Sequence, residues 1–280
     1  EIHSLLGAGG MGWVYRAHDL SLGRDVAVKV LPDAAGDDSN RIERFNREIR
    51  TVARLSHPNI VEIHDYGRAD GVSYAVMELL RGRNLREYMR GRPLPIERAL
   101  DIGVAVANGL GAAHREGILH RDIKPANIFI TSAGDVKILD FGLARVWAPP
   151  GMTTSDLATA LTTEGRVMGT AAYMAPEQSQ GGAVDARSDL FSFGVLLYHA
   201  IAGRLPFTGD TAMDVFAATA TFDPPPLARY ASGVPEELER IVRKLLAKRP
   251  AERYQSAQEV LTDLRRLRGG GARPAPGPHR

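Results

Sequence analysis

Residues 120–127 of this sequence read HRDIKPAN, and residues 140–142 read DFG. A charged loop broken by proline could be ordinary surface, but that does not explain why these residue types occur together. Asp122 can accept a proton from a hydroxyl group, and Lys124 can neutralise a phosphoryl oxygen. Asn127 and Asp140 offer oxygen ligands for magnesium. The two motifs predict phosphoryl transfer, which depends on positioning and electrostatics and needs no thiol or serine nucleophile.

A glycine-rich run near the start of the chain, GAGGMGWV at residues 7–14, is the second signal. Glycines let backbone N–H groups approach a phosphate without interference from side chains. Alone, the run could be a flexible hairpin turn, or the loop of a dinucleotide-binding fold with Asp25 as the ribose-binding acid. The dinucleotide fold needs a helix directly after the glycines. Residues 14–17 instead continue as a strand, and Asp25 precedes another strand, which argues against that fold.

A lysine at the end of an apolar strand is the third signal, because residues 26–29 read VAVK. A lone lysine in such a place usually extends to water. Glu48, however, adjoins the apolar stripe of a helix predicted over residues 41–55, so its carboxylate can point inward. The alternative is a surface pair with a neighbouring arginine of that helix, worth well under ~1 kcal/mol. A Lys29–Glu48 pair would hold the ammonium group against phosphate oxygens.

The composition is that of an ordinary soluble protein, with 280 residues, 44% of them hydrophobic and 24% charged. It excludes collagen-like, coiled-coil and wholly disordered chains. The 35 basic and 33 acidic side chains leave a net charge of +2, which gives no argument for nucleic acid or membrane partners. Because there is no cysteine, disulfides, thiolate nucleophiles and Cys-ligated metals are excluded. The histidines lack chelating spacings, so a carboxylate-bound hard ion is expected rather than zinc.

No apolar run reaches the roughly eighteen residues of a membrane-spanning helix. The richest stretch, residues 191–202, is interrupted by His199. The chain begins at Glu1 without methionine, and a strand is expected almost at once. We therefore expect a segment of a longer protein, for which the missing leader or anchor is uninformative.

Apolar periodicity predicts strands and one helix in the first eighty residues and mostly helices after Gly82. The expected strands cover residues 2–6, 13–15, 26–30, 60–63 and 73–78, and short strands around a polar loop are expected over residues 118–130 and 136–139. The expected helices cover residues 41–55, 96–114, 190–201 and 256–267, the third buried on every side. Gly117 is a natural left-handed cap, residues 148–163 are expected to be a surface loop, and the Gly/Pro-rich tail is a linker.

In their order along the chain, these motifs resemble the eukaryotic-type protein kinases, from Leu5 to about Leu267. The motifs above are followed by APE at residues 175–177 and by Asp189 in the buried helix. Phrases such as HPNIV at residues 57–61 look most like bacterial serine/threonine protein kinases. The resemblance implies an α+β, two-lobed fold, with a small antiparallel β-sheet lobe containing one key helix and a larger, mainly helical lobe.

The resemblance also implies domain bounds. The kinase domain would cover residues 1–268, with the N-lobe at 1–80 and the C-lobe at 81–268. Residues 269–280 would be a disordered Gly/Pro-rich linker tail.

Catalytic roles follow from the resemblance residue by residue. Asp122 is implied as the catalytic base, Lys124 as the group that stabilises the γ-phosphate, and Asn127 with Asp140 as the metal ligands. A functional kinase of this type transfers the γ-phosphate of ATP to Ser or Thr hydroxyls of proteins. A pseudokinase scaffold that binds nucleotide without catalysis is the main alternative, although such proteins usually lack a catalytic residue present here. A small-molecule phosphotransferase would lack the APE segment.

The nucleotide site is implied in the same way. Adenine would lie between Ala27 and Phe129, with Met77 as the gatekeeper, and Lys29 would hold the α- and β-phosphates. The implied cofactors are ATP and Mg²⁺, with Mn²⁺ as an alternative. The implied cofactor-binding residues are Leu6, Gly7, Ala8, Gly9, Gly10, Met11, Gly12, Trp13, Val14, Ala27, Lys29, Glu48, Met77, Glu78, Leu80, Phe129 and Asp140.

Two structural networks are implied as well. Val52, Ile63, His120 and Phe141 would form an apolar spine that is continuous in the active arrangement. Glu177 would pair with Arg253 and brace the peptide-binding segment.

The segment from Asp140 to Glu177 suggests regulation by phosphorylation. Its candidate acceptors are Thr153, Thr154, Ser155, Thr159, Thr162 and Thr163. Arg121 and Arg145 are cations that could receive a phosphate. We expect autophosphorylation at Thr162 or Thr163 to order this segment, the alternative being a polar loop without a switch.

Few positions depart from the family pattern. Trp13 stands where an acidic residue is frequent, Lys248-Arg249 precede Pro250 where Asp is common, and His199 replaces a frequent Glu. The implied partners are protein substrates and a second copy of the domain for trans-autophosphorylation, with no nucleic acid and no membrane contact. The implied setting is a cytoplasmic kinase domain whose parent protein could be membrane-anchored.

Overall fold

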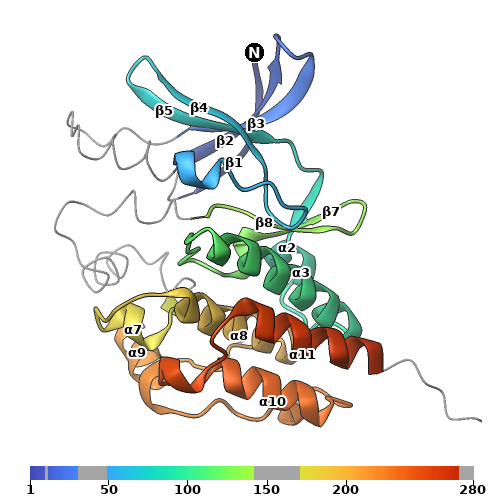
Figure 1. Cartoon of the computed structure of the whole chain (residues 1–280), viewed down its shortest axis with the longest axis vertical. Helices are drawn as coiled ribbons and strands as arrows, with labels where there is room; N and C mark the ends of the chain where they lie inside the picture. The colour runs from blue at the N-terminus through green and yellow to red at the C-terminus, as the bar shows by residue number, and fades with distance from the viewer. Residues whose placement is uncertain (10–11, 31–48, 142–170, 271–280) are drawn as a thin grey trace, which may run out of the picture.

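A computed structural model describes residues 1–9, 12–30, 49–141 and 171–270, and these form a β-sheet lobe above a helical lobe (Figure 1). Several predictions fall outside the described residues. They concern Gly10, Met11, Glu48, Arg145, the hydroxyl residues between 153 and 163, and most of the expected tail.

The N-terminal lobe is a five-stranded antiparallel sheet with the strand order β1-β2-β3-β5-β4. Its strands are β1 (Ile2–Gly9), β2 (Gly12–Asp19), β3 (Arg24–Val30), β4 (Ile63–Ala69) and β5 (Val72–Glu78). The glycine run lies on the β1–β2 hairpin. Gly12 there has a φ of 110°, a backbone conformation that residues other than glycine rarely adopt. Because β2 follows the glycines directly, the dinucleotide-binding alternative is excluded.

The expected strand over residues 60–63 is wrong for most of its length. Ile60 forms an isolated parallel bridge with Ile138, and the Val61 amide donates to the Ile138 carbonyl. This pairing buries Ile60 against the C-terminal lobe, so β4 begins only at Ile63. Residues 49–52 are helical, in agreement with the end of the predicted helix, and Ile49 and Val52 are buried.

A second antiparallel sheet lies between the lobes and has the order β6-β7-β8. Its strands are β6 (Gly82–Asn84), β7 (Ile128–Thr131) and β8 (Val136–Ile138). Within the range 118–130, where short strands around a polar loop were expected, the strand begins only at residue 128. Arg121 takes a φ of 66°, and Pro125 begins the 3₁₀ turn η1 (Pro125–Asn127), so the chain forms a loop there.

The C-terminal lobe is mainly helical, as predicted. Its α-helices are α2 (Leu85–Met89), α3 (Ile96–Arg115), α7 (Pro176–Ser179), α8 (Ala186–Ala202), α9 (Ala212–Thr221), α10 (Glu236–Leu245) and α11 (Ala257–Gly270). Two further 3₁₀ turns are η2 (Leu227–Arg229) and η3 (Pro250–Glu252). Helix α11 extends through Gly270, two residues into the range expected to be linker. Gly117 has the predicted left-handed conformation, with a φ of 71°.

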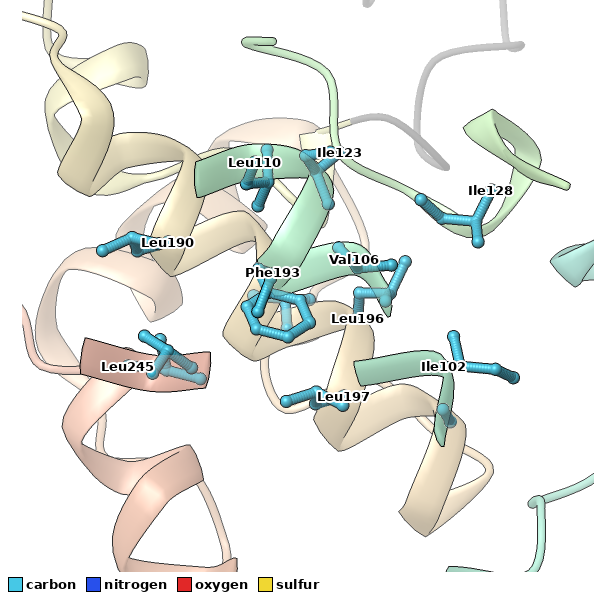
Figure 2. Close-up of a cluster of buried hydrophobic side chains, with 14 of the residues drawn as sticks. Ile102, Val106, Leu110, Ile123, Ile128, Leu190, Phe193, Leu196, Leu197 and Leu245 are labelled. Carbon is cyan, nitrogen blue, oxygen red and sulfur yellow. The ribbon is translucent and has the colours of Figure 1, made fainter. Parts of the chain in front are cut away.

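Helix α8 is the centre of this lobe. Its residues 188–198 are all buried, which agrees with the prediction of a helix apolar nearly all round. Figure 2 shows Phe193, Leu196 and Leu197 of α8 among side chains from α3, and Leu245 of α10 beside the same cluster. Within the described ranges, no helix is both long and apolar enough to cross a membrane.

Close packing at Gly194 predicts a stability effect. A Cβ atom there would lie 2.7 Å from the Leu245 Cβ and 3.1 Å from the Leu246 Cδ2. We expect Gly194→Ala to lower the free energy of unfolding by about 1–3 kcal/mol, because overpacking outweighs the better helix propensity of alanine. Urea unfolding measures this.

The matched control is Gly111→Ala in α3. The atom nearest to a Cβ there is the Ala257 Cβ at 3.7 Å, an ordinary contact. This variant should gain up to ~1 kcal/mol of stability from helix propensity. A stabilised Gly194→Ala variant would contradict the packing argument.

Candidate active site

The loop at residues 120–127 is held in place by Asp189, which is buried in the first turn of α8. The Asp189 carboxylate accepts hydrogen bonds from the backbone amides of His120 at 2.8 Å and Arg121 at 2.7 Å. It also lies 2.9 Å from the His114 Nε2. Burial raises the pKa of Asp189, but these hydrogen bonds and the charges of the two histidines outweigh burial and leave it below its usual value.

Asp122 is buried within the loop, and its side chain is fixed by two neighbours. The Asn127 Nδ2 donates to the Asp122 Oδ2 at 3.0 Å and to the Asp122 carbonyl oxygen at 2.8 Å. The Lys124 Nζ lies 2.8 Å from the same Oδ2. The structure thus brings together the three residues predicted to be catalytic.

Asp140 lies beside this loop because the Leu139 amide donates to the Asn127 carbonyl oxygen at 2.8 Å. The Asp140 Oδ1 is 2.6 Å from the Nζ of Lys29, which is 3% exposed in β3. Burial raises the pKa of the Asp140 carboxyl, but the Lys29 ammonium outweighs it, with smaller contributions from the charges of His120 and Lys124. The pKa of Asp140 therefore lies below its usual value. This ion pair joins the N-terminal lobe to the C-terminal lobe.

The predicted Lys29–Glu48 ion pair stays a prediction, because Glu48 lies outside the described residues. Lys29 has a different acidic neighbour, Asp140, which the sequence analysis did not pair with it.

The residues predicted to bind a metal fit a divalent cation by their chemistry. The Asn127 amide nitrogen donates to Asp122, and no bond to its side-chain oxygen is seen among the described residues, so that oxygen is available to a cation. Asp140 supplies a carboxylate that stays ionised. No cluster of three or more His, Asp or Glu side chains with metal-binding geometry occurs in the part of the chain that the structure describes. Mg²⁺ suits such a small set, because it keeps waters and substrate phosphates among its ligands.

The predicted adenine residues come from both lobes. Ala27 is paired in register with Met77 across β3 and β5, and Phe129 is paired with Asn84 across β6 and β7. Leu6, Gly7, Ala8, Gly12, Trp13 and Val14 lie on the β1–β2 hairpin, and Gly9 ends β1. Leu80 follows β5 in the connection to the C-terminal lobe.

The connection between the lobes is fixed at Glu78. The Glu78 Oε1 accepts a hydrogen bond from the Glu62 amide at 2.9 Å and lies 2.5 Å from the Nζ of Lys137 in β8. The first residue of the connection is therefore held in place beside the predicted adenine site.

Comparison with known proteins agrees with this geometry. The family model described as the protein kinase domain matches residues 1–264. The chain belongs to the protein kinase family. It is 42% identical over 282 residues to the serine/threonine-protein kinase PknB of Mycobacterium tuberculosis, covering 99% of this chain and 44% of that protein. A probable serine/threonine-protein kinase of Streptomyces coelicolor is 44% identical over 269 residues, covering 94% of this chain and 39% of that protein.

Solved structures agree as well. The kinase domain of M. tuberculosis PknI superposes with a TM-score of 0.73 at 30% sequence identity, covering 95% of this chain and 94% of that one. The chain spans less than half the length of the curated relatives named above. The resemblance on which the sequence analysis relied is thus confirmed, together with the two-lobed kinase fold.

The predicted spine of the kinase domain is partly visible in its ring contacts. The His120 and Phe141 rings meet edge to face with their centroids 4.7 Å apart, and both are buried. The His120 Nε2 also lies 2.8 Å from the Leu139 carbonyl oxygen. Val52 is buried in the same cluster, and Ile63 packs against it.

The predicted Glu177–Arg253 pair is present and bidentate. The two Arg253 Nη atoms lie 2.6 and 2.8 Å from the two Glu177 carboxylate oxygens. Arg253 is fully buried and also donates to the backbone carbonyls of Ala247, Arg187 and Lys248. Burial raises the pKa of Glu177, but hydrogen bonds from Arg253 and Ser188 outweigh it, so the pKa is lowered.

Sequence reasoning missed two residues of the kinase site. Gln178 accepts from the Ala175 amide at 2.9 Å and donates to the Arg121 carbonyl at 3.1 Å, so it links the APE segment to the catalytic loop. His114 supports Asp189, which was recognised as a motif residue but not given this role. A polar residue in an apolar environment was a signal for Asp189, whereas nothing in the sequence distinguished His114.

Removal of Arg253 should be strongly destabilising. We expect Arg253→Ala to lower the free energy of unfolding by about 3–5 kcal/mol near pH 7, because Glu177 would remain buried and unpaired. Since the folded-state pKa of Glu177 is lowered, the stabilisation is complete above its usual value of 4.5 and disappears as the pH falls through the folded-state value. Denaturant unfolding at several pH values measures both effects.

The control is the exposed pair of Arg249 and Glu252, whose nearest charged atoms are 3.8 Å apart. Arg249→Ala should change the stability by less than ~0.5 kcal/mol. Equal effects of Arg253→Ala and Arg249→Ala would refute the role of the buried pair.

Proposed function

We propose that this kinase domain transfers the γ-phosphoryl group of ATP to serine and threonine hydroxyls of protein substrates. The observation that carries the proposal is that Lys124 and Asn127 both contact the buried carboxylate of Asp122. All three catalytic residues and Lys29 with Asp140 are present, which argues against a pseudokinase scaffold. The named relatives are serine/threonine protein kinases, and this supports the same acceptor class here.

The geometry at Asp122 suits a general base. The contacts from Asn127 and Lys124 both go to Oδ2, so within the described residues Oδ1 is left to accept the proton of a substrate hydroxyl. As the hydroxyl oxygen bonds to the γ-phosphorus, the bond from that phosphorus to the bridging oxygen breaks. ADP leaves, and the proton remains on Asp122. The Lys124 ammonium, beside the reacting group, stabilises the negative charge of the transferring phosphoryl oxygens.

Lys29 is placed to hold the phosphates of ATP. Its aliphatic stem is buried in β3, and its ammonium already lies at Asp140, beside the catalytic loop. Asn127 and Asp140 would hold Mg²⁺, or Mn²⁺ as an alternative. When bound, the cation neutralises charge on the phosphate oxygens and orients them.

The domain is proposed to cover residues 1–268, with lobes at 1–80 and 81–268, and the residues after it are proposed to act as a linker. Because ATP is a cytoplasmic metabolite, we place the domain in the cytoplasm. We propose that it belongs to a longer protein with a membrane anchor outside this segment. A second copy of the domain is proposed as a partner for trans-autophosphorylation.

Asp122→Asn tests the proposed mechanism. It keeps the shape and the hydrogen bonding of the side chain but removes the base, so kcat should fall by about 10²–10⁴-fold. ATP binding, measured by calorimetry, should be retained. Transfer of labelled phosphate to a generic basic protein gives the rate.

Asp223→Asn, at an exposed position of the C-terminal lobe, is the matched control and should keep the full rate. Equal transfer by Asp122→Asn and the unaltered chain would sink the assigned mechanism. If the unaltered chain transferred no phosphate, the alternative of a pseudokinase scaffold without catalytic activity would be favoured.

Regulation through the segment from Asp140 to Glu177 is a further part of the proposal. Prior incubation with ATP and Mg²⁺ should raise the activity of the unaltered chain, because phosphate on Thr162 or Thr163 can pair with arginine and order the segment. The double variant Thr162→Ala/Thr163→Ala should show no such rise. Phosphopeptide mass spectrometry identifies the sites.

Thr262→Ala in α11 is the control for this experiment and should be activated like the unaltered chain. If the double variant kept both its activation and its phosphorylation pattern, these two threonines would not be the switch.

A further inference from the structure

A buried tyrosine and a histidine meet beside the APE segment. Tyr173 precedes α7 and is 8% exposed, and its hydroxyl oxygen lies 2.6 Å from the Nδ1 of His199. His199 belongs to the last turn of α8 and is half-buried. The two ring centroids are 6.1 Å apart with the planes tilted by 44°, so the contact is a hydrogen bond and not a stack.

This bond attaches a short segment, residues 171–178, to the central helix. At its other end, Gln178 attaches the same segment to the Arg121 carbonyl of the catalytic loop. Ala171 packs with Phe216 of α9. The C-terminal end of the segment is thus attached through Gln178 and through Glu177, which accepts from Ser188 of α8 and from Arg253, whereas its N-terminal part is attached to α8 by the hydrogen bond at Tyr173.

The chemistry of the pair fixes the direction of the hydrogen bond. Burial raises the pKa of the Tyr173 phenol far above its usual value, so the hydroxyl keeps its proton and can donate. If His199 donated from Nδ1 instead, the phenol proton would have no other acceptor among the described residues in a buried site, which is costly. Tyr173 thus donates, and the Nδ1 of a neutral imidazole accepts.

The surroundings of His199 keep the imidazole neutral. Burial lowers its pKa from the usual 6.5, and no charged group contributes to the shift among the described residues. From α8 and from the segment before α7, Tyr173 is the titratable group that reaches the ring. Below this lowered pKa, the proton would occupy Nδ1 and the ring could no longer accept.

We propose that His199 is a positioning residue for the protein substrate. Residues 171–178 belong to the segment expected to bind the peptide, here called the docking segment, and His199 holds this segment through Tyr173 only while the imidazole is neutral. The inference rests on the proposed kinase function and names a regulation of that site. A carboxylate at this position would accept the tyrosine hydroxyl down to about pH 4–5. The histidine therefore makes substrate docking in this chain sensitive to mild acid.

The experiment compares the unaltered chain with His199→Asn and His199→Glu, using the best Thr peptide from a degenerate library phosphorylated at pH 7.5. Asparagine offers an oxygen acceptor that does not titrate. As the pH falls from 7.5 through the pKa of the His199 imidazole, located by NMR of the folded chain, we expect the KM for the peptide to rise about fivefold more in the unaltered chain than in either variant, which corresponds to one net hydrogen bond. The KM for ATP should change equally in all three.

A spectroscopic measurement separates this role from a merely structural one. Because the phenol donor stabilises the neutral ring, Tyr173→Phe should raise the pKa of the His199 imidazole, followed by NMR of the folded chain. It should also raise the KM for the peptide at pH 7.5 and remove its extra pH dependence. Thermal unfolding of each variant establishes that it is folded.

The outcomes are distinguishable. No peptide phosphorylation at pH 7.5 would contradict the proposed function itself. Phosphorylation with the same pH dependence of the peptide KM in the unaltered chain and in His199→Asn would overturn the inference. An unchanged imidazole pKa in Tyr173→Phe would overturn it too.

Discussion

A carboxylate buried in a protein must be compensated, and the way in which Asp189 is compensated determines the shape of the catalytic loop. Its oxygens take up the backbone amides of His120 and Arg121, which forces Arg121 into a left-handed conformation with a φ of 66°. Leaving a buried charge unpaired costs several kcal/mol, so the loop has little freedom to adopt another path. The turn delivers Asp122 to the site, and α8, packed on all sides, gives the carboxylate a rigid base.

The same helix also supports the segment on which the protein substrate is proposed to dock. Arg253 and Ser188 hold Glu177 at the start of α8, whereas His199 holds Tyr173 at its end. These attachments differ in kind. The Glu177–Arg253 pair is bidentate and its arginine is fully buried, so it fixes the fold, while the Tyr173–His199 bond is a single contact between a weakly acidic and a weakly basic group. A change in protonation can therefore release one end of the segment without unfolding the other.

Much of this arrangement could be predicted from the sequence, because short motifs carry both the chemistry and the local geometry. Residue types and spacing predict the glycine run, the strand with Lys29 and the buried apolar helix over residues 190–201, whereas Asp189 and the Glu177–Arg253 pair follow from the family resemblance. What could not be predicted depends on contacts between distant segments. Ile60 has the pattern of a strand residue, yet it bridges to Ile138 in the other lobe.

The side-chain hydrogen bonds of the site illustrate the same limit. Asn127 reads equally well as a metal ligand or as a hydrogen-bond donor, and the structure shows that its amide does the second while its oxygen remains for the first. The sequence marks His199 as an interruption of an apolar stretch and as a departure from a family pattern, but its role depends on a tyrosine 26 residues earlier in the chain. A departure at a buried, hydrogen-bonded position changes which protonation state the fold requires, and this is why such positions can alter regulation while the catalytic residues stay the same.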